Sequence, residues 1–237
     1  MTAPLSAIKV IEIGTLIAAP FAARMLAEFG GLRLVFDCGL HPKLDGRKAL
    51  PQIDKIQGSV DGVILTHCHL DHLGSLPLLV RAHPGARVFA SAATTLFARR
   101  LLSNSIQVMK RQREETGNLD LPLYVDQDVE RVENALSAVP LANPRKIGRG
   151  GEEVALTFHL AGHVAGAVGC LIEHRKKKHF FTGDVHFKAQ RTVCSAAGRG
   201  TFSSTSLRPM STKWPYCTPL GQVVSQLRQV RQRSRCC

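Results

Sequence analysis

The hexapeptide HCHLDH at residues 67–72 places three imidazoles and one carboxylate within six positions. It follows the apolar, β-branched segment GVILT, which predicts a buried strand. His67 and His69 lie two residues apart at the end of this strand, so extended backbone puts both side chains on the same side. Asp71 and His72 come next, at the start of a predicted helix, and can serve a second metal ion beside the first. The spacing therefore indicates a two-metal site, and its donors suit Zn²⁺, with Fe or Mn as substitutes.

Two later segments end in residues that can complete such a site. Residues 161–166 (AGHVAG) place His163 between small residues after an alternating strand, and glycine lets a backbone pass close to a metal ion. Residues 180–184 (FFTGD) form an apolar run that ends in Asp184, whose carboxylate can bridge two cations. A single histidine or aspartate after a strand is usually a turn residue or a satisfied polar group. Both predictions therefore depend on the first motif.

Together these segments resemble the successive motifs of a known enzyme superfamily. Asp37 in LVFDCG, the segment THCHLDHLG, AGH at 161–163 and TGD at 182–184 are similar to the four motifs of the metallo-β-lactamase superfamily. Within it, the chain most resembles the β-CASP branch of RNA-processing nucleases. That narrower resemblance is carried by residues 89–95 (FASAATT), 101–105 (LLSNS), 123–129 (LYVDQDV) and 183–187 (GDVHF). The resemblance covers about residues 31 to 196.

The resemblance implies a zinc-dependent hydrolase with two ions. One zinc would be held by three histidines, His67, His69 and His163. The other would be held by Asp71, His72 and the bridging Asp184. Asp37 would orient a ligand instead of binding metal, and Asp71 could also accept the proton of the nucleophilic water. In this branch the electrophile is a phosphodiester of RNA, or less often of DNA.

The chain departs from the pattern of the branch in one respect that bears on activity. Members of the branch continue after the Gly-Asp motif into a large inserted domain, and then supply histidines that complete the second metal site and protonate the leaving group. This sequence has no histidine after His186. We therefore expect the second zinc site to be incomplete unless another chain or another residue provides the ligand. His186 shares a strand face with Asp184 by the two-residue period, so it is a candidate substitute.

The start of the chain resembles a different family. Residues 4–14 (PLSAIKVIEIG) and 17–30 are similar to the amino terminus of class III CoA-transferases (CaiB/BaiF family), which begins with a strand, a loop and a helix. The catalytic aspartate of that family lies far beyond this segment, so no transferase activity follows. The resemblance implies a change of family at residues 30–31, from a fusion or a gene-model artefact. Alternatively, residues 8–13 are simply a strand and residues 20–29 a helix.

The end of the chain is strongly basic. The protein has a net charge of +13, and residues 185–237 contain no Asp or Glu. The apolar positions 220, 223, 224, 227 and 230 have the spacing of one short amphipathic helix. One interpretation is a basic RNA-binding arm, whose phosphate contacts would make it sensitive to salt. The alternative, which the general loss of apolar periodicity favours, is a disordered or out-of-frame terminus.

Cysteine content and hydropathy indicate a compartment and exclude a membrane partner. The 237 residues include seven cysteines, without a C-x-x-C pair or the spacing of a secreted scaffold. A reducing cytoplasm fits this pattern. No run reaches the length of a membrane span, and charges interrupt the approach to and exit from the apolar segment 13–26. We expect RNA as the macromolecular partner, with DNA as an alternative and a homodimer left open.

The order of the predicted elements indicates an α/β fold of the metallo-β-lactamase αβ/βα sandwich type. Strands are predicted at residues 32–38, 61–66, 87–90, 154–159, 168–173 and 178–182, and helices at 49–57, 73–82, 92–116 and 126–135. We expect the sandwich to be incomplete, without its first strands, the β-CASP insertion and most of the second sheet. The expected domains are a CoA-transferase-like segment, a metallo-β-lactamase-like domain and a basic tail, at residues 1–30, 31–196 and 197–237.

Three functions from different classes remain open. The first is a zinc-dependent hydrolase of RNA of the β-CASP type, with endonucleolytic and exonucleolytic cleavage both open. The second is a general metallo-β-lactamase-fold hydrolase of an ester, thioester or lactam. The features around Thr94, Thr95 and Tyr124 argue against this second function. The third is a catalytically inactive fused fragment that binds metal poorly or not at all.

Overall fold

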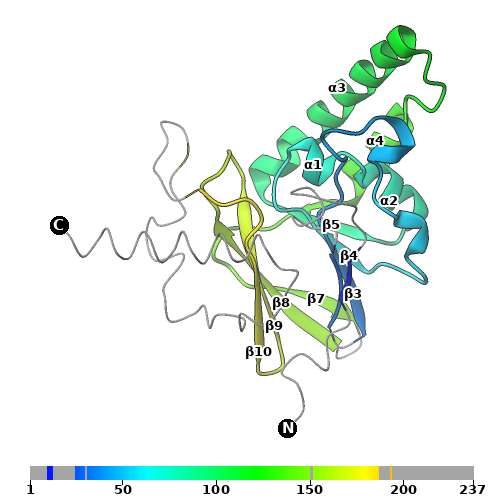
Figure 1. Ribbon diagram of the computed structural model, residues 1–237. Coiled ribbons are helices and arrows are strands. Elements are labelled where there is room, and N and C mark those ends of the chain that lie inside the picture. Colours follow the sequence, from blue (N-terminus) through cyan, green and yellow to red (C-terminus); the bar gives the residue numbers. More distant parts are fainter. Residues whose placement is uncertain (1–9, 13–24, 30, 150–151, 187–192, 194–237) are drawn as a thin grey trace.

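Helices and strands are arranged in three layers in the described part of the protein. The computed structural model describes residues 10–12, 25–29, 31–149, 152–186 and 193. Figure 1 shows the helices gathered on one side of a first sheet and a second sheet on its other side. The predicted α/β class with a sheet flanked by helices is therefore confirmed.

The first sheet has the order β1-β2-β3-β4-β5-β6 in the described residues. In that order its strands are Val10–Glu12, Met25–Phe29, Leu32–Phe36, Gly62–Ile64, Arg87–Ala90 and Leu136–Ala138. Strands β1, β2 and β3 are antiparallel neighbours, whereas β3, β4, β5 and β6 are parallel. Because the carboxyl ends of parallel strands meet at one edge of a sheet, the residues that follow β3 and β4 lie close together.

Helices cover one face of the first sheet. They are α1, α2, α3 and α4 at Leu70–Leu73, Leu76–Ala82, Ala92–Thr116 and Asp126–Ala135, with two short 3₁₀ turns, η1 and η2, at Gly46–Ala49 and Ile53–Lys55. Ser91 caps α3, because its hydroxyl accepts a hydrogen bond of 3.2 Å from the Thr94 amide. Val63 and Val88 of the strands share one buried cluster with Leu79 of α2. This cluster fixes the helices on the sheet.

The second sheet packs against the opposite face of the first. Its strands are β7, β8, β9 and β10 at Arg145–Arg149, Glu152–Leu160, Val168–His174 and Lys177–Phe181, all antiparallel in the order β10-β9-β8-β7. Leu156 and Phe158 alternate inward from β8 and join Ile64 of β4 in a second buried cluster. The rings of Phe36 and Phe181 stack between the sheets with centroids 3.7 Å apart. The two sheets therefore enclose a core of their own.

Two predictions about missing strands are wrong. The antiparallel pair β1 and β2 extends the first sheet. Strands β7 to β10, of which the last three were predicted as strands, form a second sheet that the sequence had indicated to be largely absent. Residues 25–29 form β2 where a helix was predicted, because pairing with the buried strand β3 outweighs the local pattern. Strand β7 was not predicted because its sequence, RKIGR, consists mainly of cationic residues and a glycine and lacks an apolar alternation.

Smaller differences concern the connections and the ends. The predicted helix at residues 49–57 is replaced by the 3₁₀ turns η1 and η2, which Pro51 separates. The basic run 175–178 forms the turn and the start of the last strand of the β9–β10 hairpin. The predicted tail 197–237, with its amphipathic segment, lies outside the described residues. Within the part that the structure describes, no helix has both the length and the hydropathy to cross a bilayer.

Candidate metal centre

The predicted site residues converge at the carboxyl edge of the first sheet, facing the second sheet. The HCHLDH segment runs from the end of β4 into α1. His163 lies in the loop between β8 and β9, and Asp184 follows β10. The His186 amide donates a hydrogen bond of 2.8 Å to the Ala161 carbonyl, so the segments that carry His163 and Asp184 are joined. Residues far apart in the sequence therefore meet in one site.

The loop after β3 is fixed to the HCHLDH segment through the backbone. The Cys38 amide donates a hydrogen bond of 2.7 Å to the His72 carbonyl. A Cβ at Gly39 would lie 1.7 Å from the Asp71 carbonyl oxygen, so glycine is required at this crossing. This contact sets the position of Asp37 relative to the histidines.

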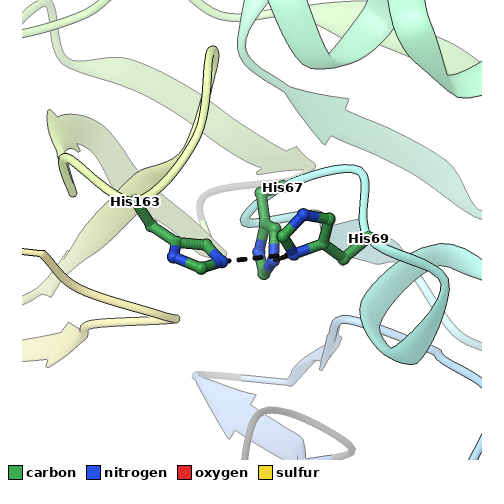
Figure 2. A group of neighbouring side chains, drawn as sticks. All are labelled: His67, His69 and His163. Atoms are coloured by element: carbon green, nitrogen blue, oxygen red, sulfur yellow. Dashed lines mark hydrogen bonds between the residues drawn. The ribbon is translucent and has the colours of Figure 1, made fainter. Parts of the chain in front are cut away.

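Three histidines face one another at the centre of the site, as Figure 2 shows. His69 Nδ1 lies 3.0 Å from His67 Nε2 and 3.2 Å from His163 Nε2. Two nitrogens bound to one tetrahedral zinc at about 2.0–2.1 Å lie about 3.3 Å from each other. The observed separations are close to that value, so these three side chains can hold one ion in nearly their present positions.

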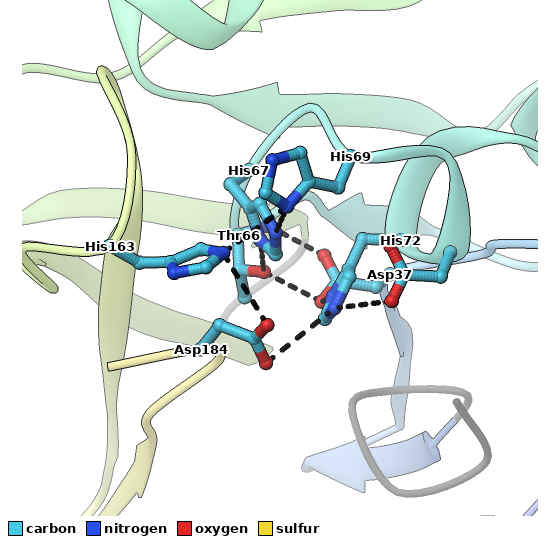
Figure 3. Close-up of polar contacts among 8 residues, drawn as sticks. Asp37, Thr66, His67, His69, His72, His163 and Asp184 are labelled. Carbon is cyan, nitrogen blue, oxygen red and sulfur yellow. Dashed lines mark hydrogen bonds and ion pairs between the residues drawn. The ribbon is translucent and has the colours of Figure 1, made fainter. Parts of the chain in front are cut away.

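A second group of donors shares His67 and adds His72 and Asp184, with ligand atoms within 4.8 Å of one another. Asp184 Oδ1 lies 3.6 Å from His72 Nε2, and Asp184 Oδ2 lies 3.6 Å from His163 Nε2 (Figure 3). One carboxylate oxygen thus faces each donor group, as a bridging ligand requires.

Asp71 lies at the rim of the site. Its Oδ2 is 3.8 Å from His72 Nε2, and its side chain is 37% exposed. Among the described residues, the two donor groups do not include it. The sequence placed Asp71, with His72 and Asp184, around the second ion, whereas the geometry brings His67 to that place. The role of Asp71 as a ligand stays a prediction.

Asp37 lies beneath the histidines and is completely buried. Its carboxylate accepts hydrogen bonds from the Thr66 amide at 2.6 Å, from the Thr66 hydroxyl at 2.7 Å and from His72 Nδ1 at 2.7 Å. Burial raises the pKa of the Asp37 carboxyl, and the His72 and Thr66 contacts oppose this shift. The φ angle of Asp37 is +53°, a left-handed conformation that costs about 1–3 kcal/mol in a residue other than glycine. The three hydrogen bonds of the carboxylate accompany this backbone conformation.

The environment changes the protonation of the histidines in different directions. Burial, and then the neighbouring imidazoles, lower the pKa of His67 to about 2. Burial also lowers the pKa of His163. At His72 burial acts in the same direction, but the attraction and hydrogen bond of Asp37, together with the attraction of Asp184 and Asp71, outweigh it, so the pKa of His72 is raised. Because neutral imidazole is the form that binds metal, the shifts at His67 and His163 favour ligation.

Two hydroxyl side chains hold the loop that carries His163, and the sequence analysis gave them no such role. The Gly166 carbonyl accepts hydrogen bonds from Ser91 Oγ at 2.6 Å and from Thr94 Oγ1 at 3.1 Å. A Cβ at Gly166 would lie 2.8 Å from the Thr94 amide nitrogen, so the loop approaches the start of α3 closely. The S-x-x-T spacing after a strand, typical of a helix start, was the available signal.

A layered α/β fold with imidazole and carboxylate donors gathered at a sheet edge defines the class of α/β proteins with a candidate metal centre. The comparison with known families identifies the superfamily. The sequence model of the metallo-beta-lactamase superfamily matches residues 25–208, and the chain belongs to this superfamily.

Several curated relatives are RNA-processing proteins. The cleavage and polyadenylation specificity factor 73 of Drosophila melanogaster is 31% identical over 174 residues, which are 73% of this chain and 24% of the relative. The cleavage and polyadenylation specificity factor subunit 3-I of Arabidopsis thaliana is 29% identical over 71% of this chain and 23% of its own length. Endoribonuclease ysh-1 of Neurospora crassa is 31% identical, with 72% of this chain and 20% of the relative covered. The chain thus spans about a quarter or less of these relatives.

These relatives confirm the predicted resemblance to the β-CASP branch of RNA-processing nucleases. The predicted resemblance to CoA-transferases is not confirmed. The superfamily match begins at residue 25, before the predicted change of family at residues 30–31. Residues 25–29 also pair with β3 in the same sheet. A short apolar strand followed by a helix-like pattern occurs in many α/β folds, so the pattern was too general to define a family.

Proposed function

We propose that this chain is the metallo-β-lactamase part of a zinc-dependent ribonuclease that hydrolyses phosphodiester bonds of RNA. The observation that carries the proposal is the position of Asp184, whose two oxygens each lie 3.6 Å from a different histidine, His72 and His163. A carboxylate in this position suits two ions side by side, and two-metal sites serve phosphodiester cleavage in nucleases and phosphatases. The names of the relatives, a cleavage and polyadenylation specificity factor and an endoribonuclease, support RNA as the substrate class.

We assign one zinc to His67, His69 and His163, and the second to His72, Asp71 and the bridging Asp184. The donors are imidazole nitrogens and carboxylate oxygens, which zinc accepts readily and which Fe and Mn share. The separations of 3.0 Å and 3.2 Å within the histidine group support a tetrahedral ion. His186, two residues after Asp184, is the candidate for a further ligand of the second ion.

The residues of the chain would position and deprotonate the reactants around this centre. When bound, two such ions acidify a water molecule and stabilise negative charge on the phosphate. Asp71, at the rim of the site, is the group that accepts the proton of the water, because its side chain is 37% exposed and can pass the proton to solvent. Asp37 holds His72 through Nδ1, so that Nε2 of the same ring faces Asp184.

We propose the cytoplasm as the compartment and RNA as the macromolecular partner. The described cysteines Cys38, Cys68 and Cys170 are buried thiols, which suit a reducing environment. DNA as a substrate and a homodimer in solution are the alternatives. Parallel assays on RNA and DNA, and size-exclusion chromatography of the purified chain, separate them.

The test combines metal content with cleavage. We expect the purified chain to hold about two zinc ions by mass spectrometry and to cut an end-labelled RNA, with product lengths that tell endonuclease from exonuclease. His69→Ala should lose zinc and cleavage together, because His69 contacts both other histidines of its group. His83→Ala, a control at the end of α2, should keep both. A chain that binds no zinc, or that hydrolyses an ester or lactam but no RNA, would overturn the proposal.

A further inference from the structure

The Thr66 side chain connects the buried carboxylate of Asp37 to the ring of His67 (Figure 3). The Thr66 hydroxyl lies 2.7 Å from Asp37 Oδ2 and 3.1 Å from His67 Nδ1. Thr66 is 2% exposed, and Asp37 and His67 are 0% exposed. Bulk water therefore does not compete for these atoms, and the protons must be shared among the three side chains.

The donors and acceptors allow one arrangement of protons when Asp37 is ionised. A carboxylate can only accept hydrogen bonds, and a hydroxyl carries a single proton. The proton of the Thr66 hydroxyl therefore points to Asp37 Oδ2, and the hydroxyl oxygen accepts from His67. That contact requires a proton on His67 Nδ1, which leaves Nε2 of the neutral ring without one.

The same carboxylate acts on a second ring directly. Asp37 Oδ2 accepts from His72 Nδ1 at 2.7 Å, so Nε2 of His72 also remains available. The Nε2 atoms of both rings face the donor groups: that of His67 lies 3.0 Å from His69 Nδ1, and that of His72 lies 3.6 Å from Asp184 Oδ1. One buried carboxylate thus controls two rings, one by contact and one through a hydroxyl.

We propose that Thr66 is a positioning residue. Its hydroxyl donates to Asp37 and accepts from His67, and this hydrogen-bond relay fixes the His67 ring in the Nδ1–H tautomer with Nε2 turned to the metal. The inference rests on the proposed metal centre, because it concerns a ligand of that centre. Partners of this kind orient metal-binding histidines, and their loss weakens metal binding by about 10–100-fold.

The surroundings of Thr66 hold its hydroxyl in the relay position. The Thr66 carbonyl accepts a hydrogen bond of 2.9 Å from the Val168 amide. The Thr66 amide donates a hydrogen bond of 2.6 Å to Asp37 Oδ1. A Cβ at Gly183 would lie 2.8 Å from Thr66 Cβ, so the turn before Asp184 closes directly over this side chain. Thr66 is therefore fixed by Asp37 after β3, by Val168 of β9 and by the turn after β10.

The relay is tested first with Thr66→Val, which keeps the shape and the backbone amide but removes the hydroxyl, and with Thr66→Ser, which restores it. We expect nitrogen NMR of the metal-free protein in alkaline buffer to show the Nδ1–H tautomer of His67 in the parent and in Thr66→Ser. Thr66→Val should lose that preference, and its first zinc should bind about 10–100-fold more weakly by calorimetry. An unchanged tautomer and affinity in Thr66→Val would overturn the relay.

A second variant keeps the inference testable if Thr66→Val does not fold. Asp37→Asn retains the acceptor for the Thr66 amide but places an amide donor where Oδ2 was. That donor reverses the direction of the hydrogen bonds to Thr66 and His72. Both His67 and His72 should therefore change to the Nε2–H tautomer, whereas Thr66→Val should change His67 alone. A parent protein with His67 already in the Nε2–H form would refute the relay. A parent that shows the expected tautomers and binds no zinc would instead refute the proposed function.

Discussion

The two halves of the candidate metal centre differ in burial and in support. The half built on the first sheet contains His67 and His72, whose exposed fractions are 0% and 1%, above the fully buried Asp37. The half built on the loops of the second sheet contains His163 and Asp184, with side chains 29% and 43% exposed. His67, His72 and Asp37, which we call the buried half, are thus part of the protein core, whereas His69 of the same segment is exposed and the half with His163 and Asp184 lies at the surface.

This difference separates two tasks that a metal centre performs. The buried half has its rings held by hydrogen bonds that do not depend on a metal ion, so the ligand atoms are positioned before binding. The exposed half supplies the bridging carboxylate from a turn, where a substrate can approach. We expect substitutions in the buried half to lower both the free energy of unfolding and metal binding, and substitutions in the exposed half to change mainly metal binding.

The largest effect is expected at Asp37. Asp37→Ala removes the acceptor of three hydrogen bonds and leaves the His72 ring and the Thr66 donors buried without it. We expect the free energy of unfolding to fall by about 3–5 kcal/mol, as for other buried pairs that lose one partner. Urea denaturation of the metal-free protein measures this change. As a control, Asp61→Ala, which removes an exposed acceptor of the Arg33 amide, should cost about 1 kcal/mol; equal losses in the two variants would contradict the comparison.

The sequence predicted the pair His67 and His69 better than the supports of the buried half. The spacing of His67 and His69 after a β-branched run was sufficient to place their side chains together, because strand periodicity is local. The donor partners of Asp37 were not predictable in the same way. Thr66 became important only because parallel pairing of β3 and β4 brings it beside the end of the preceding strand.

The same limit explains the errors in the fold. Residues 25–29 have no strand pattern strong enough to outweigh a helical one, and their pairing with β3 decides their structure. The second sheet was underestimated for a related reason: β7 carries Arg145 and Lys146 and lacks a clear apolar alternation. Long-range pairing supplies the missing information in both cases, and a single sequence does not contain it in a local form.

The next effect is an acid dependence of the metal-free protein. The pKa of His67 is lowered from 6.5 to about 2 by burial and by the neighbouring imidazoles. Below pH 6.5 His67 therefore binds a proton in the unfolded chain but not in the folded protein. The free energy of unfolding falls as the pH decreases from 6.5 towards 2. Relative to His67→Gln, we expect a loss of about 2 kcal/mol between pH 6.5 and 5, measured by denaturation in chelator. Because the raised pKa of His72 acts in the opposite direction in both proteins, the difference between them isolates His67. Parallel pH curves would show that His67 is accessible to protons.

An effect of comparable size is expected where the two halves touch. Gly183 has a φ of +55°, and a Cβ there would lie 2.8 Å from Thr66 Cβ. Gly183→Ala should cost about 1–2 kcal/mol for the left-handed backbone and about 1–3 kcal/mol more for the overlap. Gly117→Ala is the matched control, because Gly117 has a φ of +68° and no atom within 4 Å of the added Cβ. If both variants unfold at the same urea concentration, the turn before Asp184 does not depend on its contact with Thr66.

The smallest change in stability is expected at Asp184, and it gives the clearest separation of the halves. Asp184→Asn keeps the size of a side chain that is 43% exposed, so the free energy of unfolding should change by less than about 0.5 kcal/mol. The loss of charge should nevertheless weaken the binding of zinc, since the two oxygens of Asp184 face His72 and His163 from opposite sides. Zinc titration by calorimetry measures this against Asp54→Asn, an exposed carboxylate in η2 that should change neither quantity. A large loss of stability would assign Asp184 to the buried half. Unchanged stability with weaker zinc binding would show that the buried half keeps its structure without the metal, and that Asp184 in the exposed half contributes to metal binding.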